Sequence, residues 1–198
     1  MTSEAPPPER ADDPGADVGP VRTILDSAEI ARSLTRMAHQ VVELNHGADD
    51  LIVLGIPTRG VPLSRRLAAL VGQVEGVEVP VGTLDITMYR DDLRKNPTRK
   101  VGPTHVPGSI EGKNLVIVDD VLQSGRTVLA ALDALKDIGR PARVMLAVLV
   151  DRGHRELPLQ ADVTGLAIGT AADERVSVHL SEADGTDEVT IQRVGGVR

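Results

Sequence analysis

Three short apolar runs constrain the fold more than any other feature of this sequence. Leu51–Ile56, Leu115–Val118 and Ala142–Val150 are almost entirely apolar, and none of them alternates between apolar and polar side chains. A strand with one face in water alternates, whereas a strand covered on both faces reads as a continuous apolar run. Helical patterns lie between the runs. The sequence therefore predicts an α/β fold, with a mostly parallel sheet flanked by helices.

The helices are indicated by their spacing and their end signals. Asp26 and Glu29 form a capping-box pattern, after which apolar residues recur at helical spacing up to Leu44. Asn45–Gly47 is predicted to end this helix. Pro62 suits the first turn of a second helix. A third helix follows Thr127, with Val128, Leu132, Leu135 and Ile138 on one face and Gly139 as its stop.

Weaker patterns suggest the remaining elements. Val77–Tyr89 contains β-branched residues in partial alternation and predicts a strand, while 151–170 is read as irregular. Arg175–Glu182 and Asp187–Val194 predict a terminal hairpin closed by 183–186.

The domain organisation is predicted to be simple. Residues 1–20 are rich in Pro, Ala and Asp and are expected to form a disordered tail, whereas 21–198 is expected to form one domain. Residues 90–112 show no periodicity and carry several prolines and charges. A loop of that length is uncommon in a compact domain unless it has a function, such as closing over a site.

Composition excludes several classes of protein. The chain has no cysteine, so disulfides and thiolate chemistry are absent. Tyr89 is its only aromatic residue besides the five histidines, which argues against RNA binding by base stacking. The net charge of −7 disfavours broad adhesion to nucleic acid or anionic lipid. No secretory signal pattern and no apolar run of roughly 20 residues is present, so we expect a cytoplasmic protein with no membrane partner.

The run Leu115–Val118 leads directly into Asp119 and Asp120, which places two carboxylates at the carboxyl end of a buried strand. Ligands of open α/β sheets bind at such ends. Gln123–Thr127 then leads into a helix, whose first amide groups, with the Ser124 and Thr127 hydroxyls, would hold an anion. The pattern is not a Walker A loop, because the lysine of that motif is missing. A ribose 5-phosphate fits: the carboxylates accept from the ribose hydroxyls and the loop binds the phosphate.

The stretch "VIVDDVLQSGRT" resembles the phosphoribosyl-pyrophosphate signature of the type I phosphoribosyltransferases. A wider set of motifs resembles one group in that family, the pyrimidine operon regulators with uracil phosphoribosyltransferase activity. These motifs are "SLTRMAHQ", "GIPTRG", "DITMYRDDL", "DIGRP" and "AVLVDRGHRELP", and the resemblance covers the chain from about Val21 onward.

The resemblance implies the type I phosphoribosyltransferase fold, with a flexible loop at about 90–112 and a small hood at about 151–198 over the nucleobase. It implies the conversion of uracil and phosphoribosyl pyrophosphate to UMP and pyrophosphate. Mg²⁺ would be held mainly through the substrate, with Asp119 or Asp120 touching it through water. Catalytic roles would belong to Asp119, Asp120 and Arg59. The substrate-binding residues that it implies are Thr58, Arg59, Arg90, Asp119, Asp120, Val121, Leu122, Gln123, Ser124, Gly125, Arg126, Thr127, Arg152 and Val176.

The resemblance also implies regulation of pyrimidine genes through binding to operon leader mRNA, controlled by UMP or UTP. Thr35, Arg36 and His39 on the first helix, with Arg155, would contact the RNA. From the pattern alone, a solvated helix face is the better explanation of the first three residues. The family further favours a homo-oligomer, a dimer or larger.

Two alternatives stay open at the level of sequence. The chain could be an RNA-binding uridine-nucleotide sensor with weak or no turnover, or it could use another base, such as hypoxanthine or orotate. Gln123–Ser124 stands where the family usually has Tyr-Thr, and basic residues common near Gln160 and Leu166 are missing. Catalysis is therefore better supported by the sequence than RNA binding.

Overall fold

The computed structural model describes residues 19–91 and 104–195. Arg94, Lys95, Arg99 and Lys100, most of the predicted flexible loop and almost all of the predicted tail lie outside these ranges. In chain order the elements are β1 Arg22–Leu25, α1 Ser27–Asn45, β2 Leu51–Gly55, α2 Gly60–Glu75, β3 Val81–Thr83, the 3-10 turn η1 Thr87–Tyr89, β4 Asn114–Leu122, α3 Arg126–Ile138, β5 Arg143–Asp151, β6 Val163–Ala167, β7 Glu174–His179, α4 Ser181–Asp184 and β8 Glu188–Arg193.

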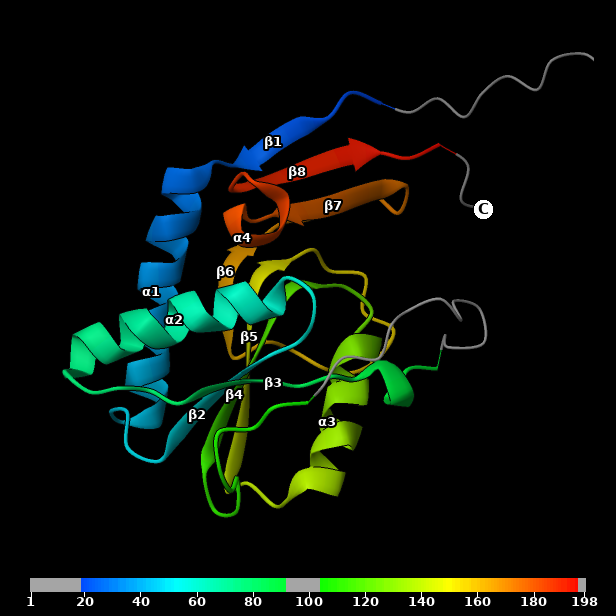
Figure 1. Cartoon of the computed structure of the whole chain (residues 1–198). Helices are drawn as coiled ribbons and strands as arrows, with labels where there is room; N and C mark the ends of the chain where they lie inside the picture. The colour runs from blue at the N-terminus through cyan, green and yellow to red at the C-terminus, as the bar shows by residue number, and fades with distance from the viewer. Residues whose placement is uncertain (1–18, 92–103, 196–198) are drawn as a thin grey trace, which may run out of the picture.

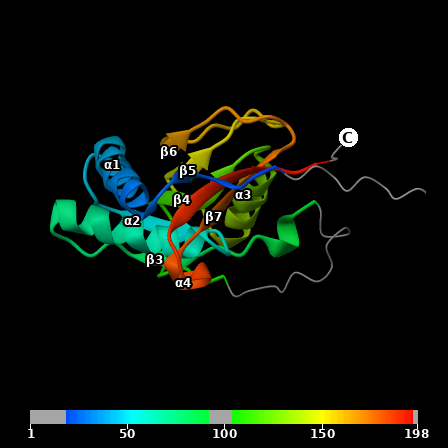
Figure 2. The same ribbon diagram turned by 90° about the horizontal axis from the view of Figure 1, so that it is seen from above.

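Five strands form the main sheet in the order β3-β2-β4-β5-β6, and every neighbouring pair is parallel. The helices α1 and α2 cover one face and α3 covers the other, which is clearest in the view from above (Figure 2). The predicted fold class is confirmed. The central strands β2, β4 and β5 are largely apolar because both of their faces are packed.

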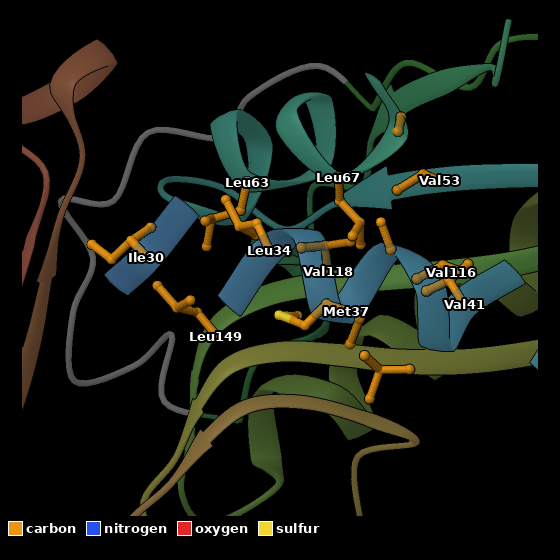
Figure 3. Close-up of a cluster of buried hydrophobic side chains, with 14 of the residues drawn as sticks. Ile30, Leu34, Met37, Val41, Val53, Leu63, Leu67, Val116, Val118 and Leu149 are labelled. Carbon is orange, nitrogen blue, oxygen red and sulfur yellow. The ribbon is translucent and has the colours of Figure 1, made fainter. Parts of the chain in front are cut away.

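Two hydrophobic clusters sit on either side of the central strand β4. Val116 and Val118 pack against α1 and α2, where Met37 and Leu67 are fully buried (Figure 3). Leu115 and Ile117 point to the opposite face and pack under α3. Successive residues of a strand alternate between faces, so this run fills both halves of the core and brings its carboxyl end to the sheet edge.

The predicted ends of α1 are confirmed. The Glu29 amide donates to the Asp26 carboxylate at 2.7 Å, the Asp26 amide donates to the Glu29 carboxylate at 2.9 Å, and His46 closes the helix in the left-handed conformation. Gly139 ends α3 as predicted. The predicted apolar face of α3 is partly wrong, since Ile138 is 38% exposed and alanines at 130, 131 and 134 complete the buried face.

Other predictions need correction. α2 begins at Gly60, two residues before Pro62. Only Val81–Thr83 of the predicted strand 77–89 is a strand, because β3 is a short edge strand followed by a bend into the η1 turn. The segment 151–170, read as irregular, contains β6, the other edge strand of the main sheet. Edge strands are short and mixed in composition, which weakens their pattern.

The predicted terminal hairpin is confirmed as the antiparallel pair β7–β8, joined by the single-turn helix α4. β1, which the sequence did not predict, pairs with β8 from the other side. These three strands form a small sheet, in the order β1-β8-β7, that stands beyond one end of the main sheet (Figure 1). Within the ranges described above, no helix has both the length and the apolar character that a membrane span requires.

Candidate functional site

A polar cavity of about 370 Å³ lies where β4 ends and α3 begins. Its lining contains Arg90, all residues from Asp119 to Thr127, Arg152 and Val176. The structure thus brings together every predicted substrate-binding residue except Thr58 and Arg59. Asp91 and Arg175 also line the cavity and are not among the predicted residues.

Asp119 and Asp120 lie within β4, which continues through Leu122, rather than after the strand's end. The Asp119 carboxylate is 7% exposed and accepts a hydrogen bond from the Asp120 amide at 2.9 Å. Asp120, on the opposite face of the strand, accepts from the Val121 amide at 2.8 Å. Burial raises the pKa of Asp119 well above its usual value, the charge of Asp120 raises it further, and Arg90 acts in the opposite direction.

The 123–127 loop turns directly into α3. Gly125 has φ of +90°, a conformation that side-chain-bearing residues rarely adopt. The Arg126 amide donates to the Ser124 hydroxyl at 3.3 Å, and Gly125, the N-cap residue of α3, has no side chain that could cap the helix. The amino end of a helix, where the first amides have no partner within the helix, suits an anion.

Segment 152–159 packs behind this loop. The amides of Glu156 and Leu157 both donate to the Ser124 carbonyl, at 3.0 and 3.1 Å. Arg155 donates to the Gln123 carbonyl at 2.8 Å and pairs with Asp151. Its guanidinium is therefore engaged inside the fold, behind the cavity.

Arg152 and Val176 form the side of the cavity nearest the small sheet. Arg152 is buried and donates to Thr170 Oγ1 at 3.1 Å and to the Ala171 carbonyl at 3.3 Å. Burial lowers the pKa of Arg152. Val176, on β7, is 8% exposed and supplies an apolar wall. Arg90 lies on the other side, with its Nη1 3.4 Å from Thr127 Oγ1.

Thr58 and Arg59 lie on the short loop between β2 and α2, which contains a cis peptide bond between Pro57 and Thr58. Neither residue lines the cavity, but the charge of Asp120 acts on the Arg59 guanidinium. Arg59 makes a bidentate pair with Asp184 of α4, at 2.7 and 3.0 Å, and this pair raises the pKa of Arg59. The loop approaches β4 closely, since a Cβ at Gly60 would lie 2.4 Å from the Val118 carbonyl oxygen.

The predicted RNA-binding residues fall into two environments. Thr35, Arg36 and His39 are exposed along α1, where Arg36 also donates to the Gly165 carbonyl of β6. Arg155 is held behind the 123–127 loop instead.

Within the described ranges, no group of three or more His, Cys, Asp or Glu residues is placed to hold a metal ion. Asp119 and Asp120 together offer carboxylate oxygens at the cavity. They fit a magnesium ion that arrives with phosphate ligands of its own, because Mg²⁺ is commonly held by one or two carboxylates plus substrate phosphates.

Arg175 and Asp184 are the main residues that sequence reasoning missed. Arg175 directly precedes Val176, a predicted substrate-binding residue, and this position next to it in the chain was the signal that could have identified Arg175. Asp184 is 125 residues from Arg59 in the chain, and no local pattern reports that contact.

Comparisons with known proteins agree with this geometry. A family model described as "Phosphoribosyl transferase domain" matches residues 20–179. The chain is 56% identical over 179 residues to a protein of Leifsonia xyli subsp. xyli named "Bifunctional protein PyrR", covering 88% of this chain and 98% of that protein. It is 58% identical over 171 residues to a Streptomyces coelicolor protein of the same name, covering 86% and 89%.

Solved structures support the fold. The hypoxanthine phosphoribosyltransferase of Trypanosoma cruzi in complex with the product IMP superimposes with a TM-score of 0.66 at 16% identity, covering 92% of this chain and 94% of that one. A Bacillus anthracis hypoxanthine-guanine phosphoribosyltransferase gives 0.63 at 18% identity, covering 87% and 97%.

Proposed function

This chain belongs to the phosphoribosyl transferase domain family, and from that premise we propose how its residues act as a uracil phosphoribosyltransferase that also regulates pyrimidine genes. Uracil displaces pyrophosphate at C1 of phosphoribosyl pyrophosphate, and UMP and pyrophosphate are the products. The observation that carries the proposal is the single cavity in which Asp119, Asp120 and the 123–127 loop meet. Its carboxylates suit ribose hydroxyls, and its helix amino end suits a 5′-phosphate.

The acidic pair orients the ribose. Asp119 and Asp120 accept hydrogen bonds from its two hydroxyls, and their negative charge favours the positive charge that develops on the sugar as its bond to pyrophosphate breaks. Asp119 or Asp120 would hold a magnesium ion that arrives with the substrate, and that ion would supply positive charge to neutralise the leaving group.

The neighbouring segments complete the proposal. The amides of the 123–127 loop hold the 5′-phosphate, and the Thr58–Arg59 loop receives the pyrophosphate, which Arg59 can reach by exchanging Asp184 for phosphate oxygens. Arg152 and Val176 lie beside the base. Positioning and charge therefore supply the catalysis.

Uracil is the favoured base because the cavity offers aliphatic walls and no aromatic platform. Tyr89 is 37% exposed, donates to Asp137, and is not part of the cavity lining. A purine would lose the stacking that an aromatic side chain provides.

Regulation through operon leader mRNA, in response to UMP or UTP, is the second part of the proposal. The exposed Thr35, Arg36 and His39 on α1 are its proposed contacts, and Arg155 stays a predicted one. The family resemblance also supports a homo-oligomer, in which a second chain would enlarge this basic surface. Phosphoribosyl pyrophosphate and nascent mRNA both occur in the cytoplasm, where we expect the protein to act.

The test is to mix purified protein with magnesium, phosphoribosyl pyrophosphate and labelled uracil, hypoxanthine, adenine or orotate in turn. We expect UMP as the only nucleotide. Asp120→Asn should lower its formation by about 10²–10³-fold with an unchanged melting temperature. A purine nucleotide would contradict the assigned base, and no product from any base would leave nucleotide sensing as the function.

A further inference from the structure

We propose that Arg155 is a positioning residue of the phosphate site: it binds carbonyl groups on the back of the 123–127 loop, so that the loop's amides face the cavity. The inference rests on the proposed function, because it assigns the cavity's phosphate. It differs from the RNA contact that the family resemblance implies for this residue.

The guanidinium of Arg155 binds several parts of the fold at once. Its Nε donates to the Leu159 carbonyl at 2.8 Å, and its Nη1 donates to the carbonyls of Gln123 at 2.8 Å and Gly153 at 3.2 Å. Its Nη2 pairs with Asp151. The Arg155 and Asp151 side chains are only 21% and 22% exposed. One side chain thus joins the end of β4, the end of β5 and the 152–159 segment.

These contacts fix the direction of the Ser124 and Gly125 N–H groups through the geometry of the peptide bond. The carbonyl of one residue and the N–H of the next share a planar trans peptide and point in opposite directions. Since Arg155 binds the Gln123 carbonyl, the Ser124 N–H points away from segment 152–159. Since Glu156 and Leu157 bind the Ser124 carbonyl, at 3.0 and 3.1 Å, the Gly125 N–H points away as well.

The opposite side of the loop is the cavity, because Gln123, Ser124 and Gly125 all line it. Two successive amides are therefore presented to a phosphate by bonds made behind them.

An arginine suits this position better than another cation. Its planar guanidinium has five donors in a fixed arrangement, so one group can satisfy several carbonyls and a carboxylate together. A lysine at 155 could keep the charge and one or two of these bonds, whereas alanine would leave the carbonyls of Gln123 and Leu159 without this donor.

The test separates phosphate binding from every other property of the site. We would measure the Kd of UMP and of uridine, the KM of phosphoribosyl pyrophosphate and of uracil, and leader RNA binding. The variants are Arg155→Ala and Arg155→Lys. Arg143→Ala is the matched control, since Arg143 also donates to a backbone carbonyl, that of Leu44, at the opposite end of β5.

We expect Arg155→Ala to weaken UMP binding and raise the KM of phosphoribosyl pyrophosphate at least ten-fold, while uridine and uracil change less than two-fold. Arg155→Lys should fall between this variant and the parent protein, and it keeps the test valid if the alanine variant does not fold. Arg143→Ala should match the parent.

Two results would overturn the inference. Unchanged UMP affinity with lost RNA binding would make Arg155 an RNA contact only, and an equal loss of UMP and uridine would mean a general distortion of the site. Failure of the proposed function looks different, because the parent protein itself would then form no UMP and bind none.

Discussion

Asp119, which we propose orients the ribose, is placed at a cost to the fold. Its carboxylate is buried at the end of an apolar strand, beside a second carboxylate, and its pKa is raised by both causes. A group whose pKa is higher in the folded state binds more protons there than in the unfolded chain. The free energy of unfolding therefore falls as pH rises from about 4, the usual pKa of an aspartate, through the raised value.

The first prediction concerns Asp119→Asn. The amide keeps the shape and can still accept from the Asp120 amide, but it carries no charge to bury. We expect the variant to melt at a higher temperature than the parent at pH 7–8, with the difference shrinking toward pH 4. UMP formation should fall by roughly 10²–10³-fold.

Thermal unfolding at several pH values, together with initial rates, checks this. Asp133→Asn on α3 is the control, because that carboxylate is partly exposed and pairs with Lys136. A variant at Asp119 that is less stable than the parent at pH 8 would contradict the expected cost of burying this charge.

For single residues, the sequence predicted those candidate site residues whose partners are close to them in the chain. Asp119, Asp120 and Gly125 could be identified because carboxylates, a left-handed glycine and a helix start follow one another in the chain. Partners of the arginines could not, since Arg59 meets Asp184 and Arg155 meets Gln123 only after the chain has folded.

Among the helices and strands, those that are most deeply buried were the easiest to predict from the sequence. The strands at the centre of the sheet, β2, β4 and β5, are apolar on both faces and were predicted from that pattern alone. The edge strands β3 and β6 are only partly buried, so they lack a continuous apolar run: β3 was predicted within too long a strand, and β6 was read as irregular. β1 pairs with β8 and is irregular in register, and four residues give no local sign of such pairing.

The second prediction belongs to the scale of elements and concerns how α2 contacts the turn between β7 and β8. Arg66 donates to Glu182 at 2.8 Å and to Asp187 at 2.7 Å, and the bond to Asp187 lowers the pKa of Asp187 to about 2. Asp187→Asn should lower the free energy of unfolding at pH 7 by about 1 kcal/mol, or the melting temperature by roughly 2–4 °C.

The sign of its pH dependence follows from the lowered pKa. The stabilisation is complete above about pH 4, where an unfolded aspartate is ionised, and is lost as pH falls toward 2. Parent and variant should therefore converge at low pH in thermal melts. Lys136→Ala serves as the control, because its pair with Asp133 on α3 is exposed and should contribute little. A difference that stays constant from pH 7 to pH 3 would contradict the role of the ion pair.

For the whole molecule, the arrangement separates two surfaces. The cavity is lined by residues from the end of β4, the start of α3 and β7, whereas Thr35, Arg36 and His39 are exposed on α1. Figures 1 and 2 show α1 on one side of the main sheet. Strand order and the joining of β1 to the terminal hairpin could not be read from the sequence, because both depend on contacts between distant segments. From that separation we expect that catalysis and the proposed RNA binding can be altered independently.

The last prediction uses this independence. His39→Ala and Arg36→Ala should each weaken binding of the protein's own operon leader RNA by about ten-fold, the equivalent of 1.4 kcal/mol, with UMP formation within two-fold of the parent. Because an arginine that neutralises one RNA phosphate adds roughly 0.7 to the slope of log K against log salt, Arg36→Ala should also flatten that slope. The measurement is RNA binding between 50 and 200 mM salt, with Arg193→Ala on β8 as the control, since Arg193 is exposed and pairs with Asp173.

The salt dependence makes this experiment decisive. With a net charge of −7, the chain repels RNA overall, so binding depends on a few local cations and each one should be visible in the slope. A slope that Arg36→Ala leaves unchanged would remove α1 from the RNA surface. A parallel loss of UMP formation would instead indicate that α1 supports the fold, because Arg36 donates to β6 of the main sheet. Only loss of RNA binding with intact catalysis is consistent with two separate surfaces on one chain.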